Sequence, residues 1–202
     1  MIRTLLLTGF GPFPGVSFNP TGPLVMELAR RHPTLQGARC VAHVFPTSYA
    51  DVDRELPVLL AHKRPDIVVM FGVAARSRHL RIETCARNAL ALTIPDASGR
   101  RPAAAMIAPG GPLQMPLRVP AQRLLAAARA EGVPAALSRD AGSYLCNYLC
   151  WRMSEPMTQA PRLAAFVHVP PVRPRPAPGF AELVRASEAI MRAAVAAPRV
   201  FR

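Results

Sequence analysis

Short apolar runs alternate with longer amphipathic stretches along this chain, which is the pattern of a β-sheet covered by α-helices. The apolar runs predict strands at Thr4–Thr8, Ala38–Phe45, Ile67–Phe71, Ala135–Ser138 and Leu163–Val169, with a further pair at Leu80–Ala86 and Ala89–Ile94. The amphipathic stretches predict helices at Pro20–Arg31, Tyr49–His62, Pro120–Glu131, Leu145–Ser154 and Ala181–Ala197. The predicted fold class is α/β: residues 1–202 form a single-domain three-layer α/β/α sandwich with a mostly parallel or mixed twisted sheet.

Local signals mark several element ends. Asn19 before Pro20 predicts an N-cap followed by a proline in the first turn of a helix, and Gly132 predicts a helix stop. Pro57 should kink or end its helix, because proline removes one backbone hydrogen bond and clashes with the preceding turn. Residues 96–120 are rich in proline, glycine and alanine, so we expect an irregular excursion there.

The composition is that of a globular protein. Half of the 202 residues are hydrophobic and only 18% are charged, which excludes an intrinsically disordered chain. No apolar run approaches the roughly 18 residues that span a bilayer, so we expect no membrane partner. The chain shows no signal peptide, and four cysteines without one do not predict a disulfide framework. We therefore expect free thiols in a cytoplasmic protein.

The formal net charge of +13 invites a nucleic-acid partner, but the distribution of the charge argues against one. Lys63 is the only lysine among 25 basic residues, and the arginines are scattered without a basic helix or arm. We expect no nucleic-acid binding. One alternative stays open, an RNA-associated α/β hydrolase acting on aminoacyl or peptidyl esters.

Four segments with candidate chemistry directly follow predicted strands, at residues 8–15, 71–78, 138–146 and 168–172. In open α/β sheets, the loops beyond the carboxyl ends of the strands form the ligand crevice. A functional site is therefore expected where these segments meet.

Cys146 is the candidate nucleophile. It lies where a strand leads through a turn at Ala141–Gly142 into a predicted helix, and the positive end of a helix dipole favours the reactive thiolate. A role as a small buried hydrophobe stays open for Cys146 and fits Cys150, one turn further on, better.

His168 and Glu83 are the candidate base and third triad member. His168 ends a strand and is followed, after Val169, by two prolines that place its side chain at the rim of the sheet. His79 is the only rival base. Glu83 has few competing carboxylates near it and could orient the imidazole, although a surface ion pair with a neighbouring arginine is the alternative.

The remaining motifs exclude other chemistry. The loop at 8–15 lacks the lysine and hydroxyl of a phosphate-binding loop, but its Phe10 and Phe13 offer either packing under the loop or an apolar slot for a flat ligand. A zinc site from Cys146, Cys150 and a histidine lacks a CxxC or HxxxH pattern. We expect neither a metal nor another cofactor.

Seven segments, in order over almost the whole chain, resemble the pyroglutamyl peptidase family, type I: TGFGPFPGVSFNPT (8–21), FPT (45–47), GVAARSRHLRIETCARN (72–88), IPD (94–96), PGGP (109–112), SRDAGSYLCNY (138–148) and FVHVPP (166–171). The resemblance implies a cysteine peptidase with the triad Glu83, Cys146 and His168. It also implies a homo-oligomer, a tetramer or a dimer, acting on peptides with N-terminal pyroglutamate.

By the same resemblance, Phe10 and Phe13 sandwich the lactam ring of the substrate. The residues implied to complete the pocket are Thr47, Val73, Ile94, Tyr144 and Leu145. A small, neutral, planar ring suits an apolar slot that has no carboxylate for an ammonium group.

Two departures from the family pattern stand out. The family usually reads DARIPD where this chain reads ALTIPD, so Thr93 replaces an arginine, and position 77 is a serine between two arginines. We expect Arg76, Arg78 or Arg87 to supply the lost cationic donor. The alternative is a catalytically weakened family member that binds a small amide ligand.

Overall fold

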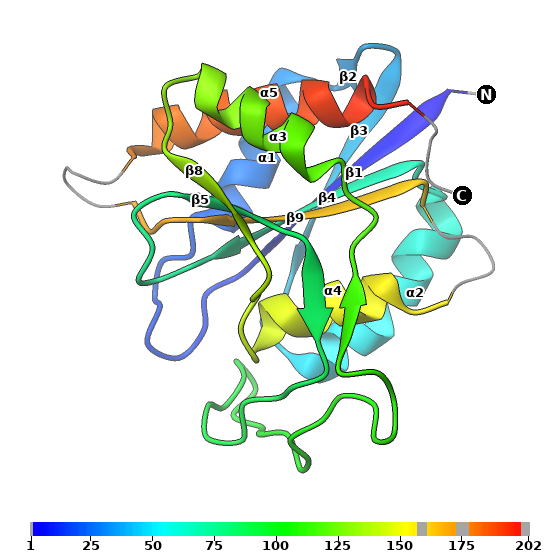
Figure 1. The fold of residues 1–202 in the computed structure, drawn as a ribbon, viewed down its shortest axis with the longest axis vertical. Helices are drawn as coiled ribbons and strands as arrows, with labels where there is room; N and C mark the ends of the chain where they lie inside the picture. The colour runs from blue at the N-terminus through cyan, green and yellow to red at the C-terminus, as the bar shows by residue number, and fades with distance from the viewer. Residues whose placement is uncertain (1, 157–160, 173–177, 199–202) are drawn as a thin grey trace.

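The computed structural model describes residues 2–156, 161–172 and 178–198 (Figure 1). Its strands are β1 Arg3–Phe10, β2 Thr34–Leu35, β3 Ala38–Phe45, β4 Ile67–Val73, β5 Leu80–Glu83, β6 Cys85–Arg87, β7 Gln114–Pro116, β8 Ala135–Ser138 and β9 Leu163–Val169. Its helices are α1 Thr21–Arg31, α2 Tyr49–Lys63, α3 Ala121–Ala130, α4 Leu145–Ser154 and α5 Phe180–Val195.

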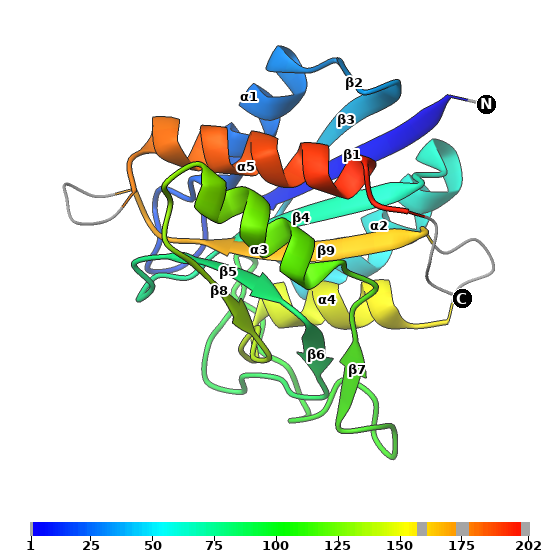
Figure 2. The same ribbon diagram turned by 45° about the horizontal axis from the view of Figure 1, so that its top comes forward.

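Seven strands form one mixed sheet in the order β2-β3-β1-β4-β9-β5-β8. The four central strands β3, β1, β4 and β9 are parallel, β2 is an antiparallel edge strand, and β5 and β8 run together antiparallel to β9. The strands β6 and β7 pair separately as a two-stranded ribbon that projects from the sandwich (Figure 2). The α/β fold with a mixed central sheet is confirmed.

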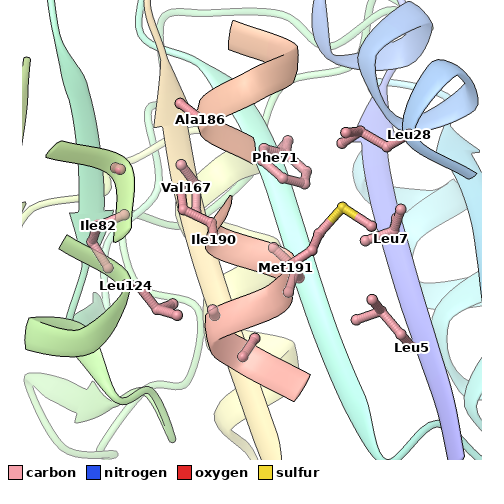
Figure 3. Close-up of a cluster of buried hydrophobic side chains, with 14 of the residues drawn as sticks. Leu5, Leu7, Leu28, Phe71, Ile82, Leu124, Val167, Ala186, Ile190 and Met191 are labelled. Atoms are coloured by element: carbon pink, nitrogen blue, oxygen red, sulfur yellow. The ribbon is translucent and has the colours of Figure 1, made fainter. Parts of the chain in front are cut away.

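Helices cover both faces of the sheet, with α1, α3 and α5 on one face and α2 and α4 on the other (Figures 1 and 2). The central strands are therefore apolar on both sides. In β4, Ile67, Val69 and Phe71 join the core under α5, whereas Val68 and Met70 join the core over α4. Figure 3 shows the first of these cores, where side chains of α5 pack between those of β1, β4 and β9.

The alternation of side chains along each strand determines which face of the sheet Gly72 and His168 belong to. Successive side chains point to opposite faces, so Gly72 belongs to the α2/α4 face that Val68 and Met70 share. In β9, Ala164 and Phe166 pack into the same core, so His168, two residues on, faces α4 as well. The candidate site is therefore built on the α2/α4 face of the sheet.

Most predicted elements are present, several with the predicted bounds, but the expected strand at Ala89–Ile94 is wrong. Its backbone pairs with distant loops instead, since the Leu90 amide donates to the Ala105 carbonyl and the Ala91 amide donates to the Ser143 carbonyl. The expected strand at Leu80–Ala86 is interrupted at Thr84. β6 then leaves the main sheet to pair with β7.

Two helix ends differ from the prediction. The helix α1 begins at Thr21 with Pro20 as N-cap, and the Asn19 side chain accepts from the Thr21 amide at 3.1 Å. The helix α2 does not end at Pro57 but continues to Lys63, because its apolar stripe, which includes Leu56 and Leu60, is held against the sheet. Gly132 stops α3 as predicted, with a φ of +73°.

Candidate active site

The His168 and Glu83 side chains meet on the α4 side of the sheet. In the antiparallel pair β5–β9, Arg81 lies opposite His168 and Glu83 lies opposite Phe166. The Nδ1 atom of His168 is 2.8 Å from Oε1 of Glu83, and both residues are buried. Because a carboxylate can only accept, Nδ1 carries the proton of this bond, which leaves Nε2 for a second partner.

Cys146, the second residue of α4, packs against the sheet at Gly72. Gly72 lies beside His168 in the β4–β9 register, and a Cβ added to Gly72 would be 2.6 Å from the Cys146 Sγ atom and 2.7 Å from Cζ of Phe166. The absent side chain therefore creates the space that the thiol occupies. The sequence analysis missed Gly72, whose signal was a glycine inside an otherwise apolar strand.

The route of the chain to Cys146 differs from the expected one. The strand β8 runs antiparallel to β9, so its last residue, Ser138, does not lie at the edge of the sheet where β9 ends. The first turn of α4 is instead fixed by hydrogen bonds to the end of β6. The Asn147 side chain accepts from the Arg87 amide and donates to the Arg87 carbonyl, each at 2.8 Å. Cys146 thus lies under the face of the sheet and not beyond a strand end.

The environment of His168 favours its protonated form. Burial alone lowers the pKa of His168, but the charge of Cys146, a hydrogen bond with the Cys146 sulfur and the Glu83 carboxylate together outweigh it and raise the pKa to about 9. In general, a cationic imidazole beside a cysteine favours the thiolate, which is the nucleophilic form of the side chain.

The other three cysteines are in a different state. All four cysteines are free thiols, but Cys40, Cys85 and Cys150 are buried and Cys146 is half-buried. Burial raises the pKa of each of the three buried thiols, and that of Cys150 well above its usual value. Accessibility and a histidine partner therefore distinguish Cys146.

A cavity of about 130 Å³ opens beside the thiol. It is lined by Phe10, Phe13, Asn19, Thr47, Val73, Ala141, Gly142, Tyr144, Leu145, Cys146 and His168. The Phe13 and Tyr144 rings pack with centroids 5.6 Å apart. No acidic side chain is present among these described lining residues, so the cavity suits a neutral, flat group.

The cavity brings together nearly all the predicted binding residues. Ile94 is the exception, because it is 44% exposed and lines a neighbouring cavity instead. Asn19, Ala141 and Gly142 line the first cavity without having been assigned to it. Asn19 was predicted only as a helix cap, and its side-chain amide donates to the Gly11 carbonyl at 3.0 Å.

A second cavity of about 740 Å³ adjoins the first and shares Ala141, Gly142 and His168 with it. Its remaining walls are Ala74, Ala75, Arg76, Ser77, His79, Arg81, Ile94 and Asp140. Arg81 places Nη2 3.2 Å from Oε1 of Glu83 and donates to Oγ of Ser138 at 2.7 Å. The sequence analysis missed Arg81, although strand alternation puts it on the same face as Glu83.

The fold places Thr93 and the three arginines that were expected to compensate for it in different surroundings. Thr93 is exposed and lines neither cavity. Among the three arginines expected to compensate, Arg76 lines the second cavity, Arg78 lines neither, and Arg87 pairs with Asp140 at 3.0 Å. The first-turn amides of α4 are donors without intrahelical partners at the position of Cys146.

No group of three or more histidine, cysteine, aspartate or glutamate side chains in residues 2–156, 161–172 and 178–198 is arranged to hold a metal ion. Within the same residues, no helix combines the length and the apolar character needed to cross a membrane.

Comparison with known proteins gives a consistent picture. A family model described as pyroglutamyl peptidase matches residues 3–183. A pyrrolidone-carboxylate peptidase of Clavibacter michiganensis is 34% identical over 83% of this chain and 78% of the relative, and one of Thermococcus onnurineus is 31% identical over 96% and 99%. The crystal structure of a pyrrolidone carboxyl peptidase from Thermus thermophilus has a TM-score of 0.84, with 31% identity over 94% of this chain and 99% of that one.

Proposed function

The chain belongs to the pyroglutamyl peptidase family, and we propose that it hydrolyses the amide bond after an N-terminal pyroglutamyl residue through a Cys146–His168–Glu83 triad. The observation that carries the proposal is the buried 2.8 Å bond between His168 and Glu83 beside the cavity that Cys146 lines. Cys146, His168 and Glu83 thus supply a thiol, a base and an orienting carboxylate beside one small apolar pocket.

The first cavity is the binding site for the pyroglutamyl ring in this proposal. Phe10, Phe13 and Tyr144 supply aromatic walls, and the ring presents no ammonium that would require a carboxylate partner. Thr47 and Asn19 both donate to the Gly11 carbonyl, so the loop that carries the two phenylalanines is fixed before a ligand arrives. Such preorganisation lowers the entropy lost on binding.

Acylation begins with the Cys146 thiolate beside the protonated His168. The sulfur attacks the carbonyl carbon of the pyroglutamyl residue and forms a C–S bond, and the carbonyl oxygen becomes an oxyanion. His168 then gives its Nε2 proton to the leaving amine nitrogen, the C–N bond breaks, and a thioester remains on Cys146. Glu83 holds Nδ1, so that Nε2 faces the reacting atoms throughout.

Deacylation reverses the proton transfer. The neutral His168 takes a proton from a water molecule whose oxygen attacks the thioester carbonyl. The C–S bond breaks, pyroglutamate leaves with a new carboxyl group, and Cys146 returns as a thiolate beside protonated His168.

Backbone amides at the start of α4 are the proposed oxyanion donors. Cys146 is the second residue of that helix, so its own N–H has no acceptor within the helix and lies at the positive end of the dipole. This arrangement does not need an arginine at position 93. Replacing Thr93 by arginine should therefore leave the rate unchanged within about twofold, a small effect because a preorganised donor is already in place.

The test compares two fluorogenic amides of five-membered-ring amino acids, pyroglutamyl-7-amido-4-methylcoumarin and prolyl-7-amido-4-methylcoumarin. The wild-type protein should cleave only the pyroglutamyl amide, because the proline nitrogen carries a charge that the cavity cannot pair. Binding of the pyroglutamyl amide without turnover would support the weakened family member instead. Equal cleavage of both amides would contradict the assignment of the first cavity to the lactam ring.

A further inference from the structure

The second cavity lies on the leaving-group side of the proposed reaction. Its shared wall with the first cavity contains His168, which protonates the departing amine, together with Ala141 and Gly142. When the pyroglutamyl ring fills the first cavity, the scissile bond lies at this shared wall. The residue that follows pyroglutamate must then enter the second cavity.

The carboxylates around the second cavity form ion pairs with arginines, and one further arginine in its wall has no such partner in the part of the chain that the structure describes. Arg81 lies 3.2 Å from Glu83, and Arg87 lies 3.0 Å from Asp140, so each of these carboxylates has a guanidinium partner. Arg76 also lines the cavity, and within the described residues its side chain has no ion pair or hydrogen bond. The unpaired charge in the cavity wall is therefore a cation.

The backbone holds Arg76 beside the catalytic histidine. The Ala74 amide donates to the carbonyl of Val169, the residue after His168, at 2.9 Å, and the Ser77 amide donates to the Ala74 carbonyl at 2.9 Å. Arg76 is thus the third residue of a tight turn tied to the end of β9. The base of its side chain is fixed, so a guanidinium can bind a carboxylate there without ordering a loop first.

We propose that this cavity recognises a carboxylate on the residue that follows pyroglutamate, with Arg76 as the specificity-determining contact. Two sources supply that group: the side chain of a glutamate or aspartate, or the free α-carboxylate of a pyroglutamyl dipeptide. A guanidinium binds either in a planar two-point contact. This preference rests on the proposed function, because it assigns the leaving group to the second cavity.

The experiment measures kcat/KM on matched peptides, each with one added carboxylate. The first pair is pyroglutamyl-glutamate amide against pyroglutamyl-glutamine amide, and the second is pyroglutamyl-alanine against its amide. We expect each carboxylate to raise kcat/KM by about fivefold at low ionic strength, the upper end for a solvent-exposed ion pair. The ratio should approach one at about 0.5 M NaCl, where exposed charges are screened. A gain in one pair only would identify which carboxylate the cavity binds.

Arg76→Gln and Arg78→Gln are the matched variants. Both remove one exposed guanidinium from the same loop, but Arg78 lines neither cavity. The carboxylate preference should fall to near one in Arg76→Gln and persist in Arg78→Gln. A wild-type ratio of one in both pairs, or a preference that survives in Arg76→Gln, would overturn the inference.

Failure of this inference is distinguishable from failure of the proposed function. Cleavage of the two neutral peptides with no carboxylate preference would leave the peptidase proposal standing and refute the role of Arg76. If no peptide is cleaved, the same pairs are titrated into the Cys146→Ala protein by calorimetry. Tighter binding of the carboxylate peptides would still support the inference, and equal binding would refute it.

Discussion

The first two turns of α4 each carry a cysteine, and the two thiols have opposite surroundings. Cys146 is half-buried, lies against Gly72 and lines the same cavity as His168, whose pKa it raises. Cys150, four residues later on the same helix, is 0% exposed within the apolar core, and burial raises its pKa well above the usual value. One turn of helix therefore separates a thiol suited to attack from one suited to packing.

The helix itself explains part of this difference. Amides in the first turn have no intrahelical acceptors and carry the positive end of the dipole, and Cys146 lies in that turn. By the second turn the amides are used within the helix, and the Cys150 side chain lies in the apolar core. Residue type thus decides little here, and position relative to the helix end and to His168 decides most.

The largest expected effect comes from exchanging each thiol for alanine. Cys146→Ala should lower kcat by at least about 10⁴-fold with folding intact, because it removes the covalent pathway. Cys150→Ala should keep the rate within a few-fold and lose about 1 kcal/mol of unfolding free energy from the space left in the core. Turnover assays and urea unfolding of both variants check this. Comparable losses of rate in the two variants would show that Cys146 is not the reactive thiol.

Gly72→Ala should have the next largest effect, because it moves the reactive thiol. The new methyl group would lie 2.6 Å from Cys146 Sγ, and a misplacement of about 1 Å costs on the order of 10²-fold in rate. Steady-state kinetics give the rate, and Gly179→Ala is the control, because Gly179 lines neither cavity.

A double mutant sharpens this prediction. Gly72→Ala should destabilise the fold less in the Cys146→Ala background, where the contact with the sulfur is absent. An equal loss of unfolding free energy in the two backgrounds would show that the thiol does not occupy this space.

The third prediction concerns pH and stability. The pKa of His168 is raised from 6.5 to about 9 in the folded protein, so the protonated form stabilises the fold. This stabilisation is fully present below pH 6.5 and is lost as the pH rises through about 9.

Urea unfolding of Cys146→Ala and Cys150→Ala between pH 6.5 and about 9 measures this pH-dependent stabilisation. In Cys146→Ala, less unfolding free energy should be lost as the pH rises, because Cys146 is the largest of the causes that raise the pKa of His168. In Cys150→Ala the full loss should remain. The same pH dependence in both variants would show that His168 does not distinguish the two thiols.

The smallest expected effect lies in front of the first turn of α4, where the Phe13 ring packs on Tyr144. Phe13→Ala should raise KM by roughly tenfold with little change in kcat, because a lost aromatic wall removes about 1–3 kcal/mol of burial. Phe18→Ala is the control, since Phe18 follows in the same loop but lines neither cavity. An unchanged KM in Phe13→Ala would place the ring elsewhere.

Some of the structure was readable from local pattern. The bounds of β3, β8, β9 and α4 match the prediction, because each is a clear apolar or amphipathic run with defined ends. The strand expected at Ala89–Ile94 failed because its amides bond to Ala105 and Ser143, and no local signal announces such distant partners. Pro57 likewise stays inside α2, where burial of the helix stripe outweighs a local rule.

The pattern of residues along the chain was enough to predict the fold class and the triad candidates, because strand and helix periods and strand-end motifs are local properties. The family resemblance supplied most of the residues around the first cavity. Which side chains touch one another became clear from the three-dimensional arrangement. It placed Gly72 under the Cys146 thiol, Arg81 on Glu83, and Ile94 and Arg76 in the second cavity. These contacts join residues far apart in the chain or on different strands, so they depend on sheet register and on the path of the chain after β8, which no local pattern encodes.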